Sequence, residues 1–285
     1  MNTLFIVGAP RSGTNALRDS ICSLAQYATW PCDEINYIWR YGNSTLNTDI
    51  ITPSLITNDS SSYIHDQFLS QYLKCFGSTS LFHGANYLVE KTCANCLRLP
   101  FVSALFPNAK YIYIRRNRYD VIASSFKRWN SSFDLKYILA KSKYVPLSEI
   151  PLYASQFISR RIRQVSSSSK QLSSWGPRFE GIDSLRQSVS LIELIALQLL
   201  ACTSAAELFF KTSSVPHISI DYEEFVQNPR EILASSLSHL ELPFEESSLS
   251  HSVSAIHSRS IGNYSKILSE CDIKIIDEVV SSYSS

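Results

Sequence analysis

The chain has 285 residues, of which 45% are hydrophobic and 12% aromatic, and this is enough apolar material for one large core. Its 26 basic and 25 acidic residues nearly cancel, so the overall charge gives no reason to expect nucleic acid as a partner. The seven cysteines are odd in number and lack the spacing of a disulfide framework, which favours free thiols and a cytoplasmic location.

Residues 3–19 predict a strand, a loop with glycine at both ends, and a helix. Leu4 to Val7 is a continuous apolar run, as in a strand that is buried on both faces. The loop runs from Gly8 to Gly13, and apolar residues follow it at helical spacing: Leu17, Ile21, Leu24, Ala25 and Ala28. Loop amides and the helix N-terminus then point at one place and favour a negatively charged ligand there.

The side chains of this loop also suit an anion. Arg11 adds a fixed cation, and Ser12, Thr14 and Asn15 add hydrogen-bond donors. The nucleoside-triphosphate pattern G-x-x-x-x-G-K-[ST] would need lysine at position 14 and a hydroxyl residue at position 15, and neither is present. The loop therefore indicates a phosphate-type anion without a metal–triphosphate. An ordinary strand–turn–helix with a surface arginine is the alternative.

Two neighbouring carboxylates, Asp33 and Glu34, follow the first helix and a short strand that is expected to end near Trp30. Carboxylates repel a phosphate, so they make sense beside an anion site if one of them takes a proton from an acceptor. The alternative is a helix start with Asp33 as the cap and Glu34 in the first turn, and both roles are compatible. Beyond this segment we expect a polar loop and a helix around 61–76.

Lys91 follows a second predicted strand, Tyr87 to Val89. Ligands bind at the carboxyl edge of open parallel sheets, so Lys91 is expected near the anion, although a surface lysine without a role is the alternative. The helix expected next contains Cys93 and Cys96. Because this pair has no second pair and no nearby histidine ligands, we expect two half-buried helix cysteines rather than a zinc site.

The stretch 110–129 predicts a second strand–helix unit with polar residues at its turn. Tyr111 to Ile114 is an apolar strand, and Asn117 with Asp120 resembles a capping box. Arg116 at the strand tip and Ser124 on the helix can converge on a second anion. The alternative is a solvated basic turn, because other arginine and lysine side chains surround this position.

The rest of the chain predicts mainly helices. Val189 to Phe210 is nearly apolar enough for a membrane span, but acidic and amide residues interrupt it, and we expect a buried core helix and no span. The other expected elements are a helical insertion at about 130–186, a strand over 218–222, a helix over 228–240 that Asn228 caps, a polar loop over 251–266 and a final helix near 272–283.

Two anion sites, a lysine at a strand tip and no magnesium-binding hydroxyl form a specific combination. With these features the chain resembles the sulfotransferases that use 3′-phosphoadenosine 5′-phosphosulfate (PAPS). In that family a [KR]-S-G-T loop binds the 5′-phosphosulfate, and this chain reads Arg11-Ser12-Gly13-Thr14. A later R-x7-S motif binds the 3′-phosphate, and Arg116 and Ser124 have that spacing.

Three weaker matches lie in the family's order along the chain. Glu90-Lys91-Thr92 with residues 106–110 looks like the central segment, whose lysine contacts the transferring group. Residues 221–229 look like a late strand–helix, and the loop from Ser258 through Ser260 to Gly262 looks like the loop over the nucleotide. The resemblance therefore spans most of the chain.

One departure concerns the catalytic base. Cytosolic small-molecule sulfotransferases have a histidine two residues after the lysine, where this chain has Cys93, a poor base if it is buried and protonated. The tyrosylprotein sulfotransferases instead use a glutamate in the segment after the first helix, and Glu34 lies in the comparable segment. The resemblance favours this glutamate-base type, with Glu34 as the first choice and Asp33 as the second.

The resemblance implies a single domain over residues 1–285, with a three-layer α/β fold, a parallel sheet of four or five strands and P-loop-like topology. It implies in-line transfer of a sulfuryl group from PAPS to an acceptor hydroxyl, without a metal. Arg11 and Lys91 would stabilise the transferring charge, and Glu34 would accept the proton. The expected nucleotide contacts are Arg11, Ser12, Gly13, Thr14, Asn15, Arg116, Ser124, Ser258, Ser260 and Gly262.

The acceptor and the reaction class leave alternatives. A carbohydrate hydroxyl is the preferred acceptor, by analogy at the level of the fold. A nucleotide or small-molecule kinase is one alternative function, and a non-catalytic nucleotide-binding module is another.

Overall fold

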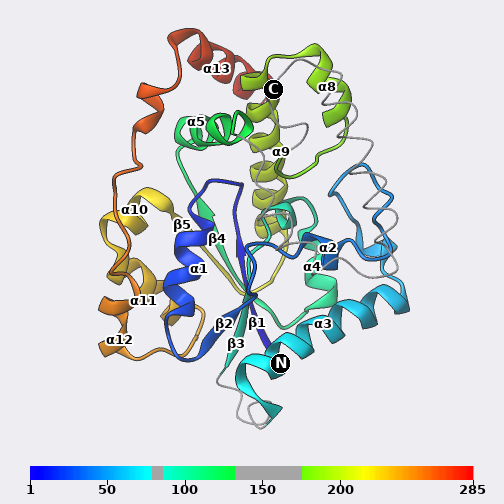
Figure 1. Cartoon of the computed structure of the whole chain (residues 1–285), viewed down its shortest axis with the longest axis vertical. Coiled ribbons are helices and arrows are strands. Elements are labelled where there is room, and N and C mark those ends of the chain that lie inside the picture. The colour runs from blue at the N-terminus through cyan, green and yellow to red at the C-terminus, as the bar shows by residue number, and fades with distance from the viewer. Residues whose placement is uncertain (79–85, 132–174, 285) are drawn as a thin grey trace.

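The computed structural model describes residues 1–78, 86–131 and 175–284 (Figure 1). Five parallel strands form one sheet in the order β2-β3-β1-β4-β5, so the predicted α/β fold with a parallel sheet is confirmed. The strands are β1 (Asn2–Val7), β2 (Tyr27–Thr29), β3 (Tyr87–Glu90), β4 (Lys110–Arg115) and β5 (His217–Asp221).

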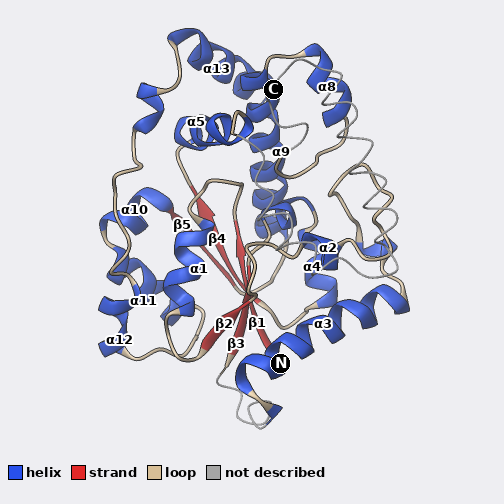
Figure 2. Cartoon of the chain, in the orientation of Figure 1, coloured by secondary structure: helices blue, strands red, loops and turns tan. Residues whose placement is uncertain are grey.

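Helices cover both faces of the sheet and complete three layers (Figure 2). Successive residues of a strand point to opposite faces, so Leu4 and Ile6 of β1 belong to one core and Phe5 and Val7 to the other. The first core includes residues of α1 (Thr14–Cys22), α10 (Tyr222–Gln227), α11 (Pro229–His239) and α12 (Glu246–Ser252). The second includes residues of α3 (Asn58–Phe76), α4 (Leu99–Leu105) and α9 (Leu191–Thr212).

The remaining elements lie around this three-layer frame. They are α2 (Asn36–Trp39), α5 (Arg118–Trp129), α8 (Ile182–Ser188), α13 (Glu270–Ser284) and the short 3₁₀ turns η1 (Pro53–Leu55), η3 (Cys93–Leu97) and η5 (Asn263–Lys266). The predicted helical insertion over 130–186 falls largely outside the described residues.

Helix α9 has the length and hydropathy of a membrane span. Its C-terminal end packs on the sheet, where the ring of Phe210 stacks on Tyr113 with centroids 5.4 Å apart. Phe210 also lies edge-on to Tyr111 at 6.0 Å, and both tyrosines belong to β4. The prediction of a core helix in this region is confirmed, although the helix begins at Leu191, after a break that separates it from α8.

The structure corrects several predictions of helix ends. Helix α1 stops at Cys22, and Ala28 lies in strand β2, because the chain turns at residues 23–26 and uses its next apolar residues in the sheet. Helix α2 begins at Asn36, so Asp33 is not its cap. Asn228 precedes α11 as predicted, but its side chain makes no capping hydrogen bond.

Two further corrections concern buried polar positions. Asn117 does cap α5 by accepting from the amides of Tyr119 and Asp120, but Asp120 does not complete a capping box. The carboxylate of Asp120 instead accepts hydrogen bonds from residues near the C-terminal end of the chain.

Cys93 and Cys96 are buried rather than half buried, because they lie on the 3₁₀ turn η3 against the sheet.

The parallel strands bring the predicted site to one edge. The loop Gly8–Gly13 follows β1, Lys91 follows β3, and Arg116 follows β4. Carboxyl ends of parallel strands share one edge of a sheet, so three segments far apart in sequence meet there. Figure 1 shows the loop after β1 at the end of the sheet where α1 and α5 begin.

Gly13 tests how tightly the loop after β1 is packed. It has a φ of 93°, and a Cβ there would lie 2.2 Å from Cδ2 of Tyr222. We predict that Gly13→Ala lowers the free energy of unfolding by about 3 kcal/mol, from left-handed strain and overpacking together. Gly181→Ala is the control, because Gly181 has a φ of 79° in the same left-handed region and open space around it. It should cost only about 1 kcal/mol in denaturant unfolding. Equal losses would contradict the close packing of Gly13 on Tyr222.

Candidate active site

The loop after β1 has an unusual backbone at two positions. Arg11 has a φ of 70° although it carries a side chain, and Gly13 has a left-handed conformation directly before α1. A left-handed residue other than glycine costs about 1–3 kcal/mol and is found mainly where function requires it. The amide of Ser12 donates to the carbonyl of Ala9 at 3.2 Å, which closes the loop. Ser12 and Thr14 are buried, whereas Arg11 and Asn15 are exposed.

Arg11, Arg116 and Ser124 form one cluster, although Arg11 lies more than 100 residues before the other two. Nε of Arg11 donates to Oγ of Ser124 at 2.8 Å. One terminal nitrogen of Arg116 donates to the carbonyl oxygen of Arg11 at 2.9 Å. The predicted 5′-phosphosulfate loop and the predicted 3′-phosphate motif are therefore in direct contact.

The C-terminal loop joins this cluster through its backbone. Arg116 donates to the carbonyl oxygen of Ser260 at 2.8 Å. The amides of Gly262 and Tyr264 donate to the buried carboxylate of Asp120 at 2.7 and 3.0 Å, which fastens the loop to α5. Ser258 is exposed, and its backbone carbonyl accepts from the amide of Ile261 at 3.1 Å.

Tyr222 is a site residue that the sequence analysis did not single out. The guanidinium of Arg116 lies over its ring, 4.4 Å from the centroid, and its hydroxyl hydrogen-bonds with Oγ of Ser260 at 2.7 Å. The same ring blocks any side chain at Gly13. The loop after β1, Arg116 and the C-terminal loop thus all contact the side chain of Tyr222. Its position directly after the last strand, at the carboxyl edge, is the signal that could have identified it.

Positive charge is concentrated in this cluster. Partial desolvation by the surrounding chain lowers the pKa of Arg11 from its ordinary value although the residue is exposed, and the charges of Arg116 and Arg128 lower it further. Arg128 was not predicted, although it lies four residues after Ser124 and therefore on the same side of α5. Nε of Arg116 is buried and has no hydrogen-bond partner among the residues that the structure describes. Several positive side chains close together, one of them with an unpaired N–H group, suit a ligand with several negative charges. These residues therefore fit a nucleotide that carries phosphate groups at its 5′ and 3′ positions.

Lys91 and Glu34 form a second cluster at the same edge. Nζ of Lys91 lies 3.3 Å from Oε1 of Glu34, and the lysine side chain is 3% exposed against 24% for the glutamate. The amide of Cys93 also donates to this oxygen, at 3.4 Å. Asp33 is turned toward Arg18 instead, with an N–O distance of 3.4 Å. Glu34 rather than Asp33 is therefore the carboxylate in contact with Lys91.

Cys93 separates this cluster from the loop after β1. Its sulfur lies 3.9 Å from Oγ1 of Thr14, the first residue of α1. Burial raises the pKa of the Cys93 thiol far above its ordinary value, so the thiol is neutral at pH 7. Burial lowers the pKa of Lys91, and the nearby carboxylate of Glu34 raises it. With Cys93 neutral, Glu34 is the charge that keeps Lys91 protonated.

Glu90 directly precedes Lys91 in the chain, and it is 1% exposed. Its carboxylate accepts from the hydroxyl of Thr92 at 2.5 Å and from the amide of Asn95 at 2.8 Å. Burial raises the pKa of the Glu90 carboxyl from 4.5 to about 7.

In the described residues no group of three histidine, cysteine or acidic side chains could hold a metal ion.

The sequence model of the sulfotransferase family matches residues 3–145, which is half of the chain and includes the loop after β1, Lys91 and the pair Arg116 and Ser124. No curated protein matches the chain significantly.

Solved structures give a likeness of fold at low sequence identity. The sulfotransferase domain from the curacin biosynthetic pathway has a TM-score of 0.51 and 16% identity, over 99% of this chain and 97% of that domain. A mouse sulfotransferase complexed with PAP has a TM-score of 0.46 and 13% identity, over 99% and 84% of the two chains. A sulfotransferase from Alicyclobacillus acidocaldarius has a TM-score of 0.44 and 16% identity, over 93% and 95%.

Glu90 predicts a pH dependence of stability. A carboxyl whose pKa is higher in the folded state favours folding most below its unfolded pKa, and that contribution is lost as the pH rises to about 7. The difference between the two pKa values corresponds to about 3 kcal/mol. We expect the free energy of unfolding to fall between pH 4.5 and 7, and Glu90→Gln to flatten this fall. Denaturant unfolding at several pH values measures this fall in the free energy of unfolding. An equally steep fall in the variant would contradict the assignment to Glu90.

Proposed function

The chain belongs to the sulfotransferase family, and on that premise we propose that it transfers a sulfuryl group from PAPS to an acceptor hydroxyl. The observation that carries this proposal is the cluster in which Arg11, Arg116 and Ser124 hold two predicted anion motifs in contact. PAPS carries a phosphosulfate at the 5′ position and a phosphate at the 3′ position. A site with two adjoining anion-binding motifs suits such a donor.

The described residues support distinct roles in the transfer. Arg116 and Ser124 hold the 3′-phosphate, while Arg11, Ser12, Thr14 and the amides after Gly13 hold the 5′ end. Lys91 lies at the same edge and stabilises the charge on the transferring group. The acceptor oxygen forms a bond to sulfur as the bond from sulfur to the bridging phosphate oxygen breaks. Adenosine 3′,5′-bisphosphate leaves with the electrons of that bond.

Glu34 accepts the proton of the acceptor hydroxyl in this proposal. Its carboxylate is partly exposed and touches Lys91, so an acceptor that reaches it also reaches the sulfuryl group. Cys93 occupies the position of the histidine base in other members but is buried and neutral. We therefore assign the base to another segment, and the contact between Glu34 and Lys91 supports Glu34 in this role.

A carbohydrate remains the first acceptor class to test. Two tryptophans that could have stacked on a sugar, Trp30 and Trp39, are buried in the core and are not available. Tyr41 and Tyr63 stack at 3.9 Å and are only partly buried, so they offer an aromatic surface after Glu34 in sequence. All seven cysteines are free, which suits our proposal of a cytoplasmic location.

The direct test incubates the chain with PAPS and a panel of sugar, phenol and aliphatic alcohols, and measures release of adenosine 3′,5′-bisphosphate together with the sulfated product. Product from at least one hydroxyl class is expected. Turnover of ATP with Mg²⁺, or nucleotide binding without any transfer, would favour a kinase or a binding module instead.

Arg116→Ala should abolish preference for the 3′-phosphate. A charge-assisted contact contributes about 1.5–3 kcal/mol, so affinity for adenosine 3′,5′-bisphosphate should fall tenfold to a hundredfold. Affinity for adenosine 5′-phosphate should fall less, because Arg116 also supports the loop that holds the 5′ end, and calorimetry measures both. Arg118→Ala is the control, because Arg118 is exposed two residues further on. If Arg116→Ala keeps the wild-type ratio of affinities, the 3′-phosphate is bound elsewhere.

Glu34→Gln should lower turnover while donor binding stays near normal. A general base contributes about 10²- to 10⁴-fold, and glutamine keeps the size of the side chain without accepting a proton. Steady-state kinetics and binding of adenosine 3′,5′-bisphosphate separate the two effects. Asp33→Asn is the control, since Asp33 pairs with Arg18. Near-normal turnover in Glu34→Gln, with a large loss in Asp33→Asn, would move the role to Asp33.

A further inference from the structure

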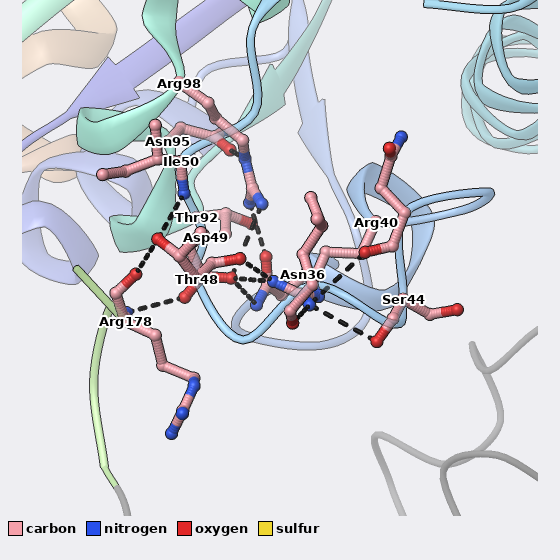
Figure 3. A network of polar contacts seen from close by, with 12 residues as sticks. Asn36, Arg40, Ser44, Thr48, Asp49, Ile50, Thr92, Asn95, Arg98 and Arg178 are labelled. Atoms are coloured by element: carbon pink, nitrogen blue, oxygen red, sulfur yellow. Dashed lines mark hydrogen bonds and ion pairs between the residues drawn. The ribbon is translucent and has the colours of Figure 1, made fainter. Parts of the chain in front are cut away.

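A buried polar network connects the segment that follows Glu34 to the turn that follows Lys91. Figure 3 shows the part of this network that contains Asn36, Thr92 and Arg98. The amide of Ile35 donates to Oγ1 of Thr92 at 3.1 Å, and the hydroxyl of Thr92 donates in turn to Glu90. The residue directly after Glu34 is thereby tied to the residues on both sides of Lys91.

A second connection starts one residue later. Oδ1 of Asn36 accepts from Arg98 at 2.5 Å, and Nδ2 of Asn36 donates to Oδ1 of Asp49 at 3.2 Å. Arg98 also donates to Asn95, which donates to Glu90. Asp49 accepts from Arg40 at 2.9 Å, so the loop that follows α2 is drawn into the same network. Figure 3 shows Asp49 between Arg98, Asn36 and Arg40.

The members of this network are shielded from water. Exposed fractions are 1% for Glu90 and Thr92, 3% for Asn95, 0% for Arg98 and 2% for Asp49. Nη1 of Arg98 has no hydrogen-bond partner among the described residues and lies 3.8 Å from Oδ1 of Asp49. A buried polar group is costly without hydrogen bonds, so the network favours the arrangement that makes the bonds named above. Glu34 lies in irregular chain between Trp30 and the short helix α2, where no regular backbone ladder fixes its place. The hydrogen bonds that Ile35 and Asn36 make to Thr92 and Arg98 fix the segment of Glu34 instead.

We propose that Thr92 is a positioning residue for sulfuryl transfer, whose hydroxyl holds the Ile35 amide and thereby keeps the Glu34 carboxylate against Nζ of Lys91. This inference rests on the proposed function, in which Glu34 accepts the proton of the acceptor. Thr92 touches neither donor nor acceptor in it and acts through Glu34. A displacement of about 1 Å in a reacting group can cost about 10²-fold in rate, so the loss of one hydrogen bond behind the base is measurable.

The test compares Thr92→Val, which keeps the shape and removes the hydroxyl, with Thr92→Ser, which keeps the hydroxyl. We expect Thr92→Val to lower kcat tenfold to a hundredfold, with KM for PAPS and affinity for adenosine 3′,5′-bisphosphate within about twofold of wild type. Thr92→Ser should return kcat to within about threefold. The amide of Ile35 should exchange with deuterium at least tenfold faster in Thr92→Val, which reads the lost hydrogen bond without any assay of activity.

Thr48→Val is the matched control at the far side of the network. The hydroxyl of Thr48 donates to the carbonyl of Arg178 at 2.8 Å and accepts from the amide of Ile50, but does not touch the residues next to Glu34. It should lower the melting temperature and leave kcat near wild type. Equal losses of kcat in Thr48→Val and Thr92→Val would overturn the positioning role in favour of general stability.

Two other outcomes also decide the matter. Normal kcat in Thr92→Val, with wild-type chain active and Glu34→Gln impaired, would overturn this inference and leave the proposed function standing. A wild-type chain that transfers no sulfuryl group from PAPS to any hydroxyl class would overturn both. The two failures are therefore told apart by the wild-type assay.

Discussion

The guanidinium of Arg116 joins three parts of the chain that are far apart in sequence. It donates to the carbonyl of Arg11 in the first loop and to the carbonyl of Ser260 near the C-terminus, and it stacks on Tyr222 after the last strand. A planar group with five donors can make these contacts at once, which a lysine could not do. The proposed anion site therefore depends on completion of the whole sheet, since its parts follow β1, β4 and β5.

The sheet was predictable because its signals are local. Apolar runs such as Leu4 to Val7 and Tyr111 to Ile114 have the length and composition of buried strands, and both are strands in the structure. The errors occur where a local pattern competes with a distant contact. Asp120 has the spacing of a capping box, yet it binds the amides of Gly262 and Tyr264 more than 140 residues away. No spacing within α5 could reveal that partner.

In the candidate site, too, residues with a local sequence signal were predicted and residues that depend on distant contacts were missed. Motif spacing identified Arg11, Arg116 and Ser124, and the structure brings these three together, although their roles in binding stay predictions. Tyr222 and the network around Asp49 were missed, because a tyrosine after a strand and an aspartate in a polar loop carry no distinctive spacing. Their importance comes from what packs against them.

The proposed position of the proton acceptor explains why such a network is needed. A base placed directly on the turn after Lys91 would be held by the 3₁₀ turn itself, but this position is Cys93, which burial keeps neutral. A base from the loop after β2 gains access to solvent and acceptor, and Glu34 is indeed the more exposed member of its pair. Fixing the backbone of each residue costs about 1–2 kcal/mol of conformational entropy, and no helix or strand hydrogen bonds offset this cost at Glu34, so buried hydrogen bonds on its inner side have to do so. Thr92 lies between Lys91 and Cys93 in sequence, where one hydroxyl can reach the amide next to Glu34.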